Sequence, residues 1–325
     1  MGPGVITGRY GTIGKVFYQE DDFWPLNTTL WVSDFHGNDR RFIYYLLQCI
    51  DFATHSGKSG VPGLNRNDLH TEDVTLPTDL LEQAAIADAL WAVDDLIAAV
   101  ERQINKSQAI SQGMMQHIVS GGSRLPGFAR PWNTATLGDL CALRSGTPKA
   151  RAAGGRYWVV DMGSVTREAE FVVTRMTNDS VGLLHPGELV MPKDDIGGGN
   201  IIGRTGLIDR RDSYVLADHV YALTPRDVDP AFLNYAINSR KVNAALRSKA
   251  TGSAQLGLSR KSVLDQEIDY PSDVEEQRAI AHIMTDAGRE VAALRARLRK
   301  VRAVKVGMMQ ELLTGRTRLP VKAAS

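Results

Sequence analysis

The densest group of side chains able to do chemistry lies between residues 240 and 264 of this 325-residue sequence. This segment contains no acidic residue and six basic ones: Arg240, Lys241, Arg247, Lys249, Arg260 and Lys261. Such a run is suited to contacts with phosphate groups. Glutamine and arginine can also bond bidentately to nucleobase edges, so Gln255 and Arg260 are candidate base readers. The alternative is a solvated helix face.

A shorter basic stretch near the N-terminus could play the same role. His55, Lys58 and Arg66 have no acidic residue between them, although Asp51 and Asp68 bound the stretch. Arg9 and Arg204 each stand in a Gly-Arg-x-Gly segment, from which an arginine can reach outward. A structural turn whose arginine binds a carboxylate is an equally good interpretation of these two.

The sequence gives little support for a phosphate loop, a metal site or a catalytic site. Gly197-Gly198-Gly199-Asn200 lacks the GxxxxGK[ST] pattern of a phosphate loop, and we interpret it as a flexible loop. Asp194-Asp195 are interpreted as turn residues, because no histidine or further acidic residue follows at ligand spacing. The motifs of a methyltransferase or a nucleotide-driven motor are missing. We therefore expect no catalytic residue, no metal and no cofactor bound by this chain.

Composition limits the class of protein further. The formal net charge is +1, so any binding to nucleic acid must come from local patches rather than from a generally basic surface. Two cysteines are too few for a disulfide framework, which favours a reducing cytoplasm. No secretion signal and no apolar stretch of about 18 residues is present, so we expect no membrane association.

A long internal repeat organises the chain. Residues 82–126 and 276–320 both begin with Glu-Gln, continue through Gly-Met-Met-Gln and end with Arg-Leu-Pro, at a constant offset of 194 residues. Each copy starts with the spacing of a helix capping box, from Asp79 to Glu82 and from Asp273 to Glu276. Each ends with a glycine, Gly121 or Gly315, that suits a helix C-terminus. The repeat predicts two helices of about 35 residues.

Both helices carry apolar residues alternately three and four positions apart, which indicates a coiled-coil seam. The seam residues of the first helix are Ile86, Leu90, Val93, Ile97, Val100 and Ile104. Those of the second helix are Ile280, Met284, Val291, Leu294, Leu298 and Val301, with an interruption at Lys305. The alternative is that each helix packs only on its own globular part.

Charge favours pairing of the two helices. Residues 79–116 hold six acidic and two basic side chains, whereas residues 276–311 hold four acidic and eight basic ones. Helices of opposite charge attract each other. Because two repeats related by a pseudo-twofold axis meet head to tail, we predict an antiparallel coiled coil.

The globular parts are predicted to be mixed α/β domains. β-branched runs at 157–160, 171–173, 188–191 and 215–223 suggest strands, and a helix is expected over 230–248. Similar segments precede both helices: Ile6–Gly11 resembles Ile201–Gly206, and Phe42–Tyr45 resembles Phe232–Tyr235. We expect a partial domain (its C-terminal half) over 1–77, a helix over 78–126, a second domain over 127–272, and the second helix with a tail over 273–325. The missing half would lie upstream, have been lost, or come from another chain.

Two domains, each followed by a long helix that opens with Pro and Glu-Gln and ends in a signature of the Leu-Leu-Thr-Gly-x-x-Arg-Leu-Pro type, resemble the DNA specificity (S) subunits of type I restriction-modification systems. Pro271, Glu276-Gln277 and Leu312-Leu313-Thr314-Gly315 with Arg318-Leu319-Pro320 carry this resemblance. It covers the whole chain. It departs from the family in the shortened first domain.

The resemblance implies a non-catalytic subunit that binds double-stranded DNA at a two-part site. It implies two methyltransferase subunits as partners, with restriction subunits as further partners. S-adenosylmethionine is then expected on the DNA adenine methyltransferase and not on this chain. The alternative function is a coiled-coil scaffold that docks methyltransferase subunits without reading DNA.

Overall fold

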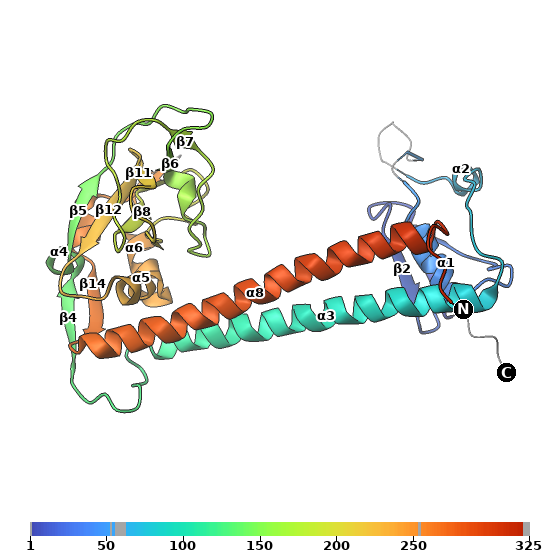
Figure 1. Ribbon diagram of the computed structural model, residues 1–325, viewed down its shortest axis with the longest axis horizontal. Coiled ribbons are helices and arrows are strands. Elements are labelled where there is room, and N and C mark those ends of the chain that lie inside the picture. Colours follow the sequence, from blue (N-terminus) through green and yellow to red (C-terminus); the bar gives the residue numbers. More distant parts are fainter. Residues whose placement is uncertain (1, 53, 56–62, 253–254, 321–325) are drawn as a thin grey trace. The chain divides into compact units, whose positions relative to one another are not determined.

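The computed structural model describes residues 2–52, 54–55, 63–252 and 255–320, and it divides into two compact units. Unit 1 comprises residues 1–105 and 292–325, and unit 2 comprises residues 106–291. Each unit holds a globular part and a segment of each of the two long helices, α3 (Leu80–His117) and α8 (Val274–Leu312) (Figure 1). The expected fold class, mixed α/β domains with two long helices, is confirmed.

The ends of the long helices follow from their sequence, with one exception. Oδ1 of Asp79 accepts a hydrogen bond from the backbone N–H of Leu81 at 2.9 Å, and Asp273 caps α8 in the same way. After each helix a glycine adopts a left-handed conformation, with φ of 75° at Gly121 and 71° at Gly315. The full capping boxes are not formed, because the side chains of Glu82 and Glu276 bind arginines instead.

The Glu-Gln pair at the start of each long helix fixes two other elements. Glu276 forms a bidentate ion pair with Arg124 in unit 2, at 2.7 and 2.8 Å, and Glu82 binds Arg318 in unit 1. The adjacent side chains, Gln83 and Gln277, each donate to the carbonyl of the preceding proline and accept from the N-cap residue of a short helix. Those N-cap residues are Asp39 and Asp229.

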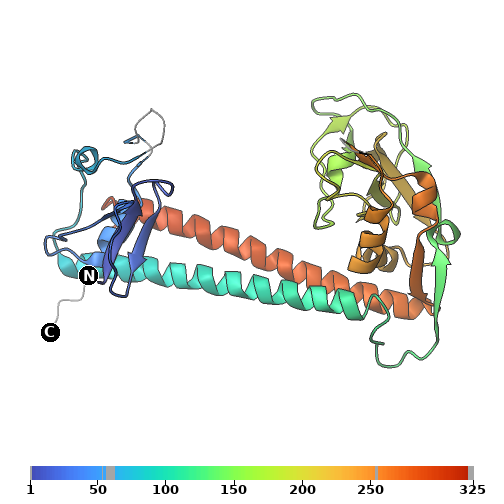
Figure 2. The same cartoon turned by 180° about the vertical axis from the view of Figure 1, so that it is seen from behind.

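Within each unit, α3 and α8 lie side by side and run antiparallel (Figure 2). In unit 1, Arg302 pairs with Glu101 at 2.6 Å and Lys305 pairs with Asp94 at 2.7 Å. In unit 2, the hydroxyl of Ser107 donates to Glu290 at 3.0 Å. Residues early in α3 therefore meet residues late in α8, and the basic helix faces the acidic one. The predicted antiparallel pairing is confirmed.

The seam residues differ in how completely they are buried. The fully buried ones are Ile86, Leu90, Val100, Ile104, Ile280 and Met284. The half-buried ones are Val93, Ile97, Val291, Leu294, Leu298 and Val301. Ile86 and Leu90 share a core with Leu312 in unit 1, and Ile280 and Met284 join the core of unit 2, whereas Val100 and Ile104 are buried in the middle of α3, outside both cores.

The globular part of unit 1 is a three-stranded antiparallel sheet in the order β2-β1-β3, with two short helices. Its elements are β1 (Gly4–Gly8), β2 (Val16–Gln19), β3 (Thr29–Trp31), α1 (Arg40–Leu47) and α2 (Arg66–Leu69). One core, around Val5, Val16 and Leu64, lies on the sheet. A second core joins Phe42 and Tyr45 of α1 to the two long helices.

The globular part of unit 2 contains one four-stranded antiparallel sheet and three smaller sheets. The four-stranded sheet has the order β10-β8-β12-β5, formed by β10 (Gly206–Leu207), β8 (Leu189–Pro192), β12 (Val220–Pro225) and β5 (Cys141–Ser145). The smaller sheets are β11-β6-β7, from β11 (Tyr214–Leu216), β6 (Tyr157–Val160) and β7 (Met176–Thr177); β13-β9, from β13 (Leu256–Gly257) and β9 (Asp194–Asp195); and β14-β4, from β14 (Glu267–Pro271) and β4 (Trp132–Thr136).

The short helices of unit 2 contribute residues to its main core, with the exception of one 3₁₀ turn. They are α4 (Leu137–Leu140), the 3₁₀ turn η1 (Met162–Ser164), α5 (Pro230–Asn238), α6 (Arg240–Ser248) and α7 (Arg260–Leu264). The helix expected over 230–248 is interrupted, because Ser239 ends α5 and its hydroxyl caps α6. The run 215–223 is likewise divided between β11 and β12, and residues 171–173 form only a single bridge, between Phe171 and Val165.

The two globular parts share a substructure, but not at the offset that their sequences suggest. In both, a central strand pairs with two later strands, as β1 does with β2 and β3 and as β8 does with β10 and β12. α1 and α5 follow, each with an aspartate N-cap and a fully buried phenylalanine, Phe42 or Phe232. Ile6–Gly11 begins in the central strand, whereas Ile201–Gly206 leads into β10, so this predicted correspondence is wrong. Across the described residues, no helix is long and apolar enough to cross a membrane.

Candidate nucleic-acid interface

Three segments of unit 2 come together to present the candidate binding residues. β13 pairs antiparallel with β9, which places Gln255 and the residues after it beside the loop that follows β9. The backbone N–H of Leu258 donates to the carbonyl of Lys193 at 2.7 Å. Thr251 and Gly257 exchange two backbone hydrogen bonds, which returns the chain from the end of α6 to β13. The surface combines residues 193–204, the end of α6 and residues 255–261.

Several lysines of the basic run are already engaged by neighbouring side chains. Lys241 pairs with Asp269 at 2.8 Å, and Lys261 pairs with Asp265. Lys249 donates to the amide oxygen of Gln266 at 2.9 Å. These partners lie just beyond residue 264, so the acid-free segment is partly neutralised once the chain folds.

Two arginines and the candidate glutamine remain open. The guanidinium groups of Arg247 and Arg260 form no ion pair or hydrogen bond within the described part of the chain, and both side chains are exposed. Arg247 lies in the last turn of α6, and Arg260 begins α7, which Ser259 caps through a hydrogen bond from Ser262 N–H at 3.0 Å. Gln255 is exposed, as a base-reading side chain must be.

One prediction for Arg204 was that its side chain points outward, and the structure places it differently. It is half-buried, and its Nη1 donates to the backbone carbonyl of Asn238 at 2.9 Å. Its Nε is buried without a hydrogen-bond partner among the described residues. Burial and the nearby positive charge of Arg247 lower the pKa of Arg204. Because an arginine side chain stays protonated in proteins, the guanidinium still contributes a positive charge, held within the domain by the hydrogen bond to Asn238.

The candidates in unit 1 are less uniform. Arg9 is exposed directly after β1, with its guanidinium 5.3 Å from the ring centroid of Tyr10, and Arg66 is exposed at the start of α2. His55 faces Glu72 at 2.8 Å, an ion-pair geometry that occupies its side chain. Lys58 lies outside the described residues. Among the described members of this set, Arg9 and Arg66 are thus the exposed cations.

Two lysines in comparable places were not selected from the sequence. Lys193 follows β8 directly, and its ammonium lies 5.9 Å from the ring centroid of Tyr221. The Tyr221 hydroxyl donates to the carbonyl of Leu258, and burial raises its pKa, which keeps the phenol protonated. Lys15 is exposed immediately before β2, the place that the segment containing Arg204 occupies before β10. Neither stands in a basic run.

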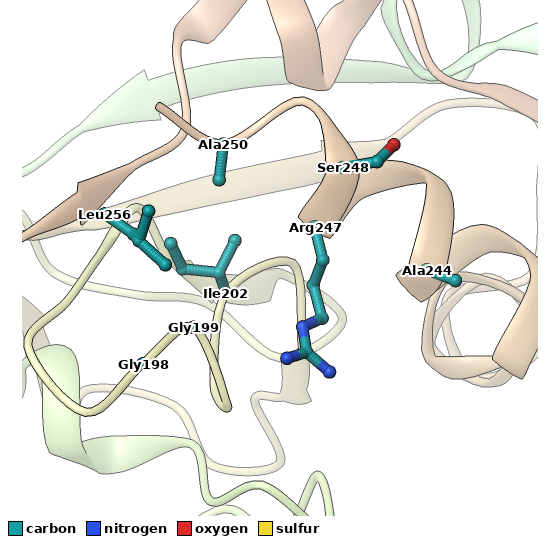
Figure 3. Close-up of a pocket in the computed structure, with 8 residues that line it drawn as sticks. All are labelled: Gly198, Gly199, Ile202, Ala244, Arg247, Ser248, Ala250 and Leu256. Carbon is teal, nitrogen blue, oxygen red and sulfur yellow. The ribbon is translucent and has the colours of Figure 1, made fainter. Parts of the chain in front are cut away.

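The described residues contain no group of three histidine, cysteine or acidic side chains that could hold a metal ion. One cavity of about 330 Å³ opens in unit 2 between α6 and the glycine loop after β9 (Figure 3). Its walls include Gly198, Gly199, Ile202, Arg247 and Leu256.

Comparison with known proteins gives a consistent result. A family described as the type I restriction modification DNA specificity domain matches residues 2–107 and 129–302. The crystal structure of a type I restriction-modification system S subunit from M. genitalium superposes with a TM-score of 0.68 at 15% identity, over 95% of this chain and 82% of that chain. A chain from a structure on complex assembly of the type I R-M system has a TM-score of 0.55 at 15% identity, covering 97% and 82%.

Proposed function

This chain belongs to the family of type I restriction modification DNA specificity domains, and we propose that it reads a two-part DNA target with the exposed surfaces of its two globular parts. Its role is that of the DNA specificity subunit of a type I restriction-modification system. The observation that carries this proposal is the match of the family to two separate regions of the chain, one in each half of the repeat.

In unit 2, contact with DNA is assigned to the surface around Arg247, Gln255 and Arg260. The two arginines carry charge that no described carboxylate neutralises, so they can replace counterions on phosphates. Gln255 lies between them in the chain and remains exposed for a base edge. Lys249 and Lys261 contribute less, because each would first have to leave Gln266 or Asp265.

In unit 1, the corresponding contacts are assigned to Arg9 and Arg66, with Lys15 as an addition. All three side chains are exposed. His55 is assigned a lesser part, because Glu72 occupies its imidazole.

Membership of this family supports the partners that we propose. Two methyltransferase subunits bind this chain, restriction subunits join them, and the complex acts in the cytoplasm. The chain supplies no catalytic group, and S-adenosylmethionine belongs to the methyltransferase. A scaffold that does not read DNA is not favoured, because the matching family is defined by DNA specificity.

Selection from randomised duplexes tests the proposal. The chain is purified with its methyltransferase subunits, the complex is incubated with the pool, and the retained duplexes are sequenced. We expect enrichment of one motif made of two short parts with a fixed spacing. Retention without any enriched sequence would favour the scaffold.

Two variants separate base reading from phosphate contact. Gln255→Ala should relax the enriched motif at one position of one part and leave the other part unchanged. Arg260→Gln should lower affinity for all duplexes if it contacts phosphate, or relax one position if it reads a base. Arg240→Gln is the matched control, an exposed arginine at the start of α6 that stays outside the proposed contacts.

A further inference from the structure

The cavity in unit 2 combines apolar walls with a cationic rim. Ile202, Ala250 and Leu256 supply apolar surface, and Arg247 and Ser248 come from the end of α6. In Figure 3 the Arg247 side chain extends along the cavity toward the loop that carries Gly198 and Gly199. Its Nη2 lies 3.9 Å from where a Cβ on Gly199 would stand.

The glycine loop leaves its backbone open to this cavity. Gly198 and Gly199 both have φ of 80°, a backbone conformation that residues with a side chain rarely adopt. A Cβ on Gly199 would also lie 2.9 Å from Cδ1 of Leu256, so any larger residue would close the space. Within the described chain, the N–H groups of these two glycines donate no hydrogen bond. Backbone N–H groups that line a cavity and donate to no other group suit an anion.

Nearby negative charge is already satisfied by other groups. Asp195 accepts hydrogen bonds from the N–H groups of Gly197 and Ile201, at 2.5 and 3.2 Å, and so holds the loop in place. Glu168, whose charge also acts on Arg204, bonds Arg167 at 2.6 Å. The carbonyls at the end of α6 accept from Lys249 and Ala250 N–H. Arg204 adds a second positive charge beside Arg247, fixed to the Asn238 carbonyl.

We propose that this cavity seats one sugar-phosphate unit of a DNA strand, with the phosphate held by Arg247 and the N–H groups of Gly198 and Gly199. The deoxyribose packs on Ile202, Ala250 and Leu256. This inference rests on the proposed function and adds to it a preformed contact for a single phosphate. It also gives a role to the glycine loop, which the sequence favours only as a flexible connection.

The salt dependence of DNA binding tests the site without knowledge of the target sequence. A fluorescent duplex of arbitrary sequence is titrated with the full chain across a series of KCl concentrations. Each phosphate contact contributes about 0.9 to the slope of log K against log salt. Arg247→Gln should reduce the magnitude of this slope by about 0.9, the value of one phosphate contact. It should also lower the affinity about tenfold at 0.1 M salt. Arg240→Gln should change neither.

Leu256→Ala distinguishes the sugar contact from the phosphate contact. It should weaken binding about threefold through lost apolar contact, without changing the salt slope. Inorganic phosphate, added at constant ionic strength, should compete with the duplex on the wild type and not on Arg247→Gln.

An unchanged slope for Arg247→Gln would overturn the proposal. Phosphate could raise the melting temperature of the wild type but not that of Arg247→Gln, while both proteins keep the same salt slope. In that case the cavity would be a site for a free anion. Because these readouts need no sequence preference, they are separable from the duplex selection. A complex that enriches no motif would refute the proposed function and leave the phosphate result standing.

Discussion

Units 1 and 2 use the same types of side chain to fix the ends of the two long helices, but the next contacts along the helix interface differ between the units. In both, a buried glutamate at the start of one long helix binds an arginine that follows the other, and the adjacent glutamine holds a short helix. Beyond this layer, unit 1 has a charged cluster, in which Asp94 accepts from Tyr45 at 2.8 Å and pairs with Lys305.

Unit 2 has a neutral contact at the same level. The Tyr235 hydroxyl meets the Thr285 hydroxyl at 3.1 Å. By the offset of the repeat, Gly288 and Ser111 stand where unit 1 has Asp94 and Lys305. The shared layer fixes the helix ends, whereas the charged cluster distinguishes one end of the pair from the other. Polar groups in a helix interface commonly specify register in this way.

The largest expected effect comes from the apolar layer that both units share. Leu90 and Met284 occupy equivalent positions of the repeat and are both fully buried. Leu90→Ala and Met284→Ala should each lower the free energy of unfolding by about 2–5 kcal/mol, because each leaves a cavity. Leu294→Ala, at a half-buried position, should cost less. Urea denaturation of the three variants measures this, and an equal loss for Leu294→Ala would show that this half-buried position is packed as tightly as the fully buried ones.

A substitution in the charged cluster of unit 1 should have an effect of intermediate size, larger than that of a substitution at the neutral contact of unit 2. Lys305→Met leaves Asp94 without its cation, and the side chains are only 17% and 31% exposed, so we expect a loss of about 1–3 kcal/mol. Tyr235→Phe, which removes the neutral contact in unit 2, should cost about 0.5–1.5 kcal/mol. Hydrogen exchange resolved by unit is the measurement. Equal losses would mean that the cluster adds nothing specific to unit 1.

The smallest expected effect is a change in how the stability of unit 2 depends on acidic pH. Hydrogen bonds from Lys241 and Thr134 lower the pKa of Asp269, which ties β14 to β4 in unit 2. A lowered pKa gives stability that is present above the unfolded value of about 4 and is lost as the pH falls through the folded value. Lys241→Gln should therefore reduce stability at pH 7 by less than about 1 kcal/mol and by less still at pH 3. Arg240→Gln is the control, and equal losses for Lys241→Gln at both pH values would contradict this pairing.

The sequence predicts those features that repeat along it. The 194-residue offset, the seam and the opposite charges lead to two antiparallel helices with glycine ends, because each pattern can be recognised without knowing which residues meet in the fold. The role of Glu82 was mistaken for a local cap, since its partner, Arg318, lies at the far end of the sequence. Lys305 looked like an interruption for the same reason, because Asp94 can be matched to it only once the pairing register is known.

The candidate interface was predicted less completely than the fold. A basic run can be read from the sequence, but the neutralisation of Lys241 by Asp269 depends on β14 lying beside α6. The glycine loop and Arg247 are about fifty residues apart in the chain and meet only across the cavity. The mistaken match of Arg9 with Arg204 arose because a short Gly-Arg motif carries less information than the order of strands in a sheet.

Mapping of methylated bases in cells that express this chain with its methyltransferase tests the central claim most directly. The account predicts one methylated sequence made of two short parts with a fixed gap, altered in one part only when Gln255 is changed to alanine. Methylation that is absent or scattered without a shared sequence, in cells where the complex assembles, would contradict the claim that this chain specifies the DNA target.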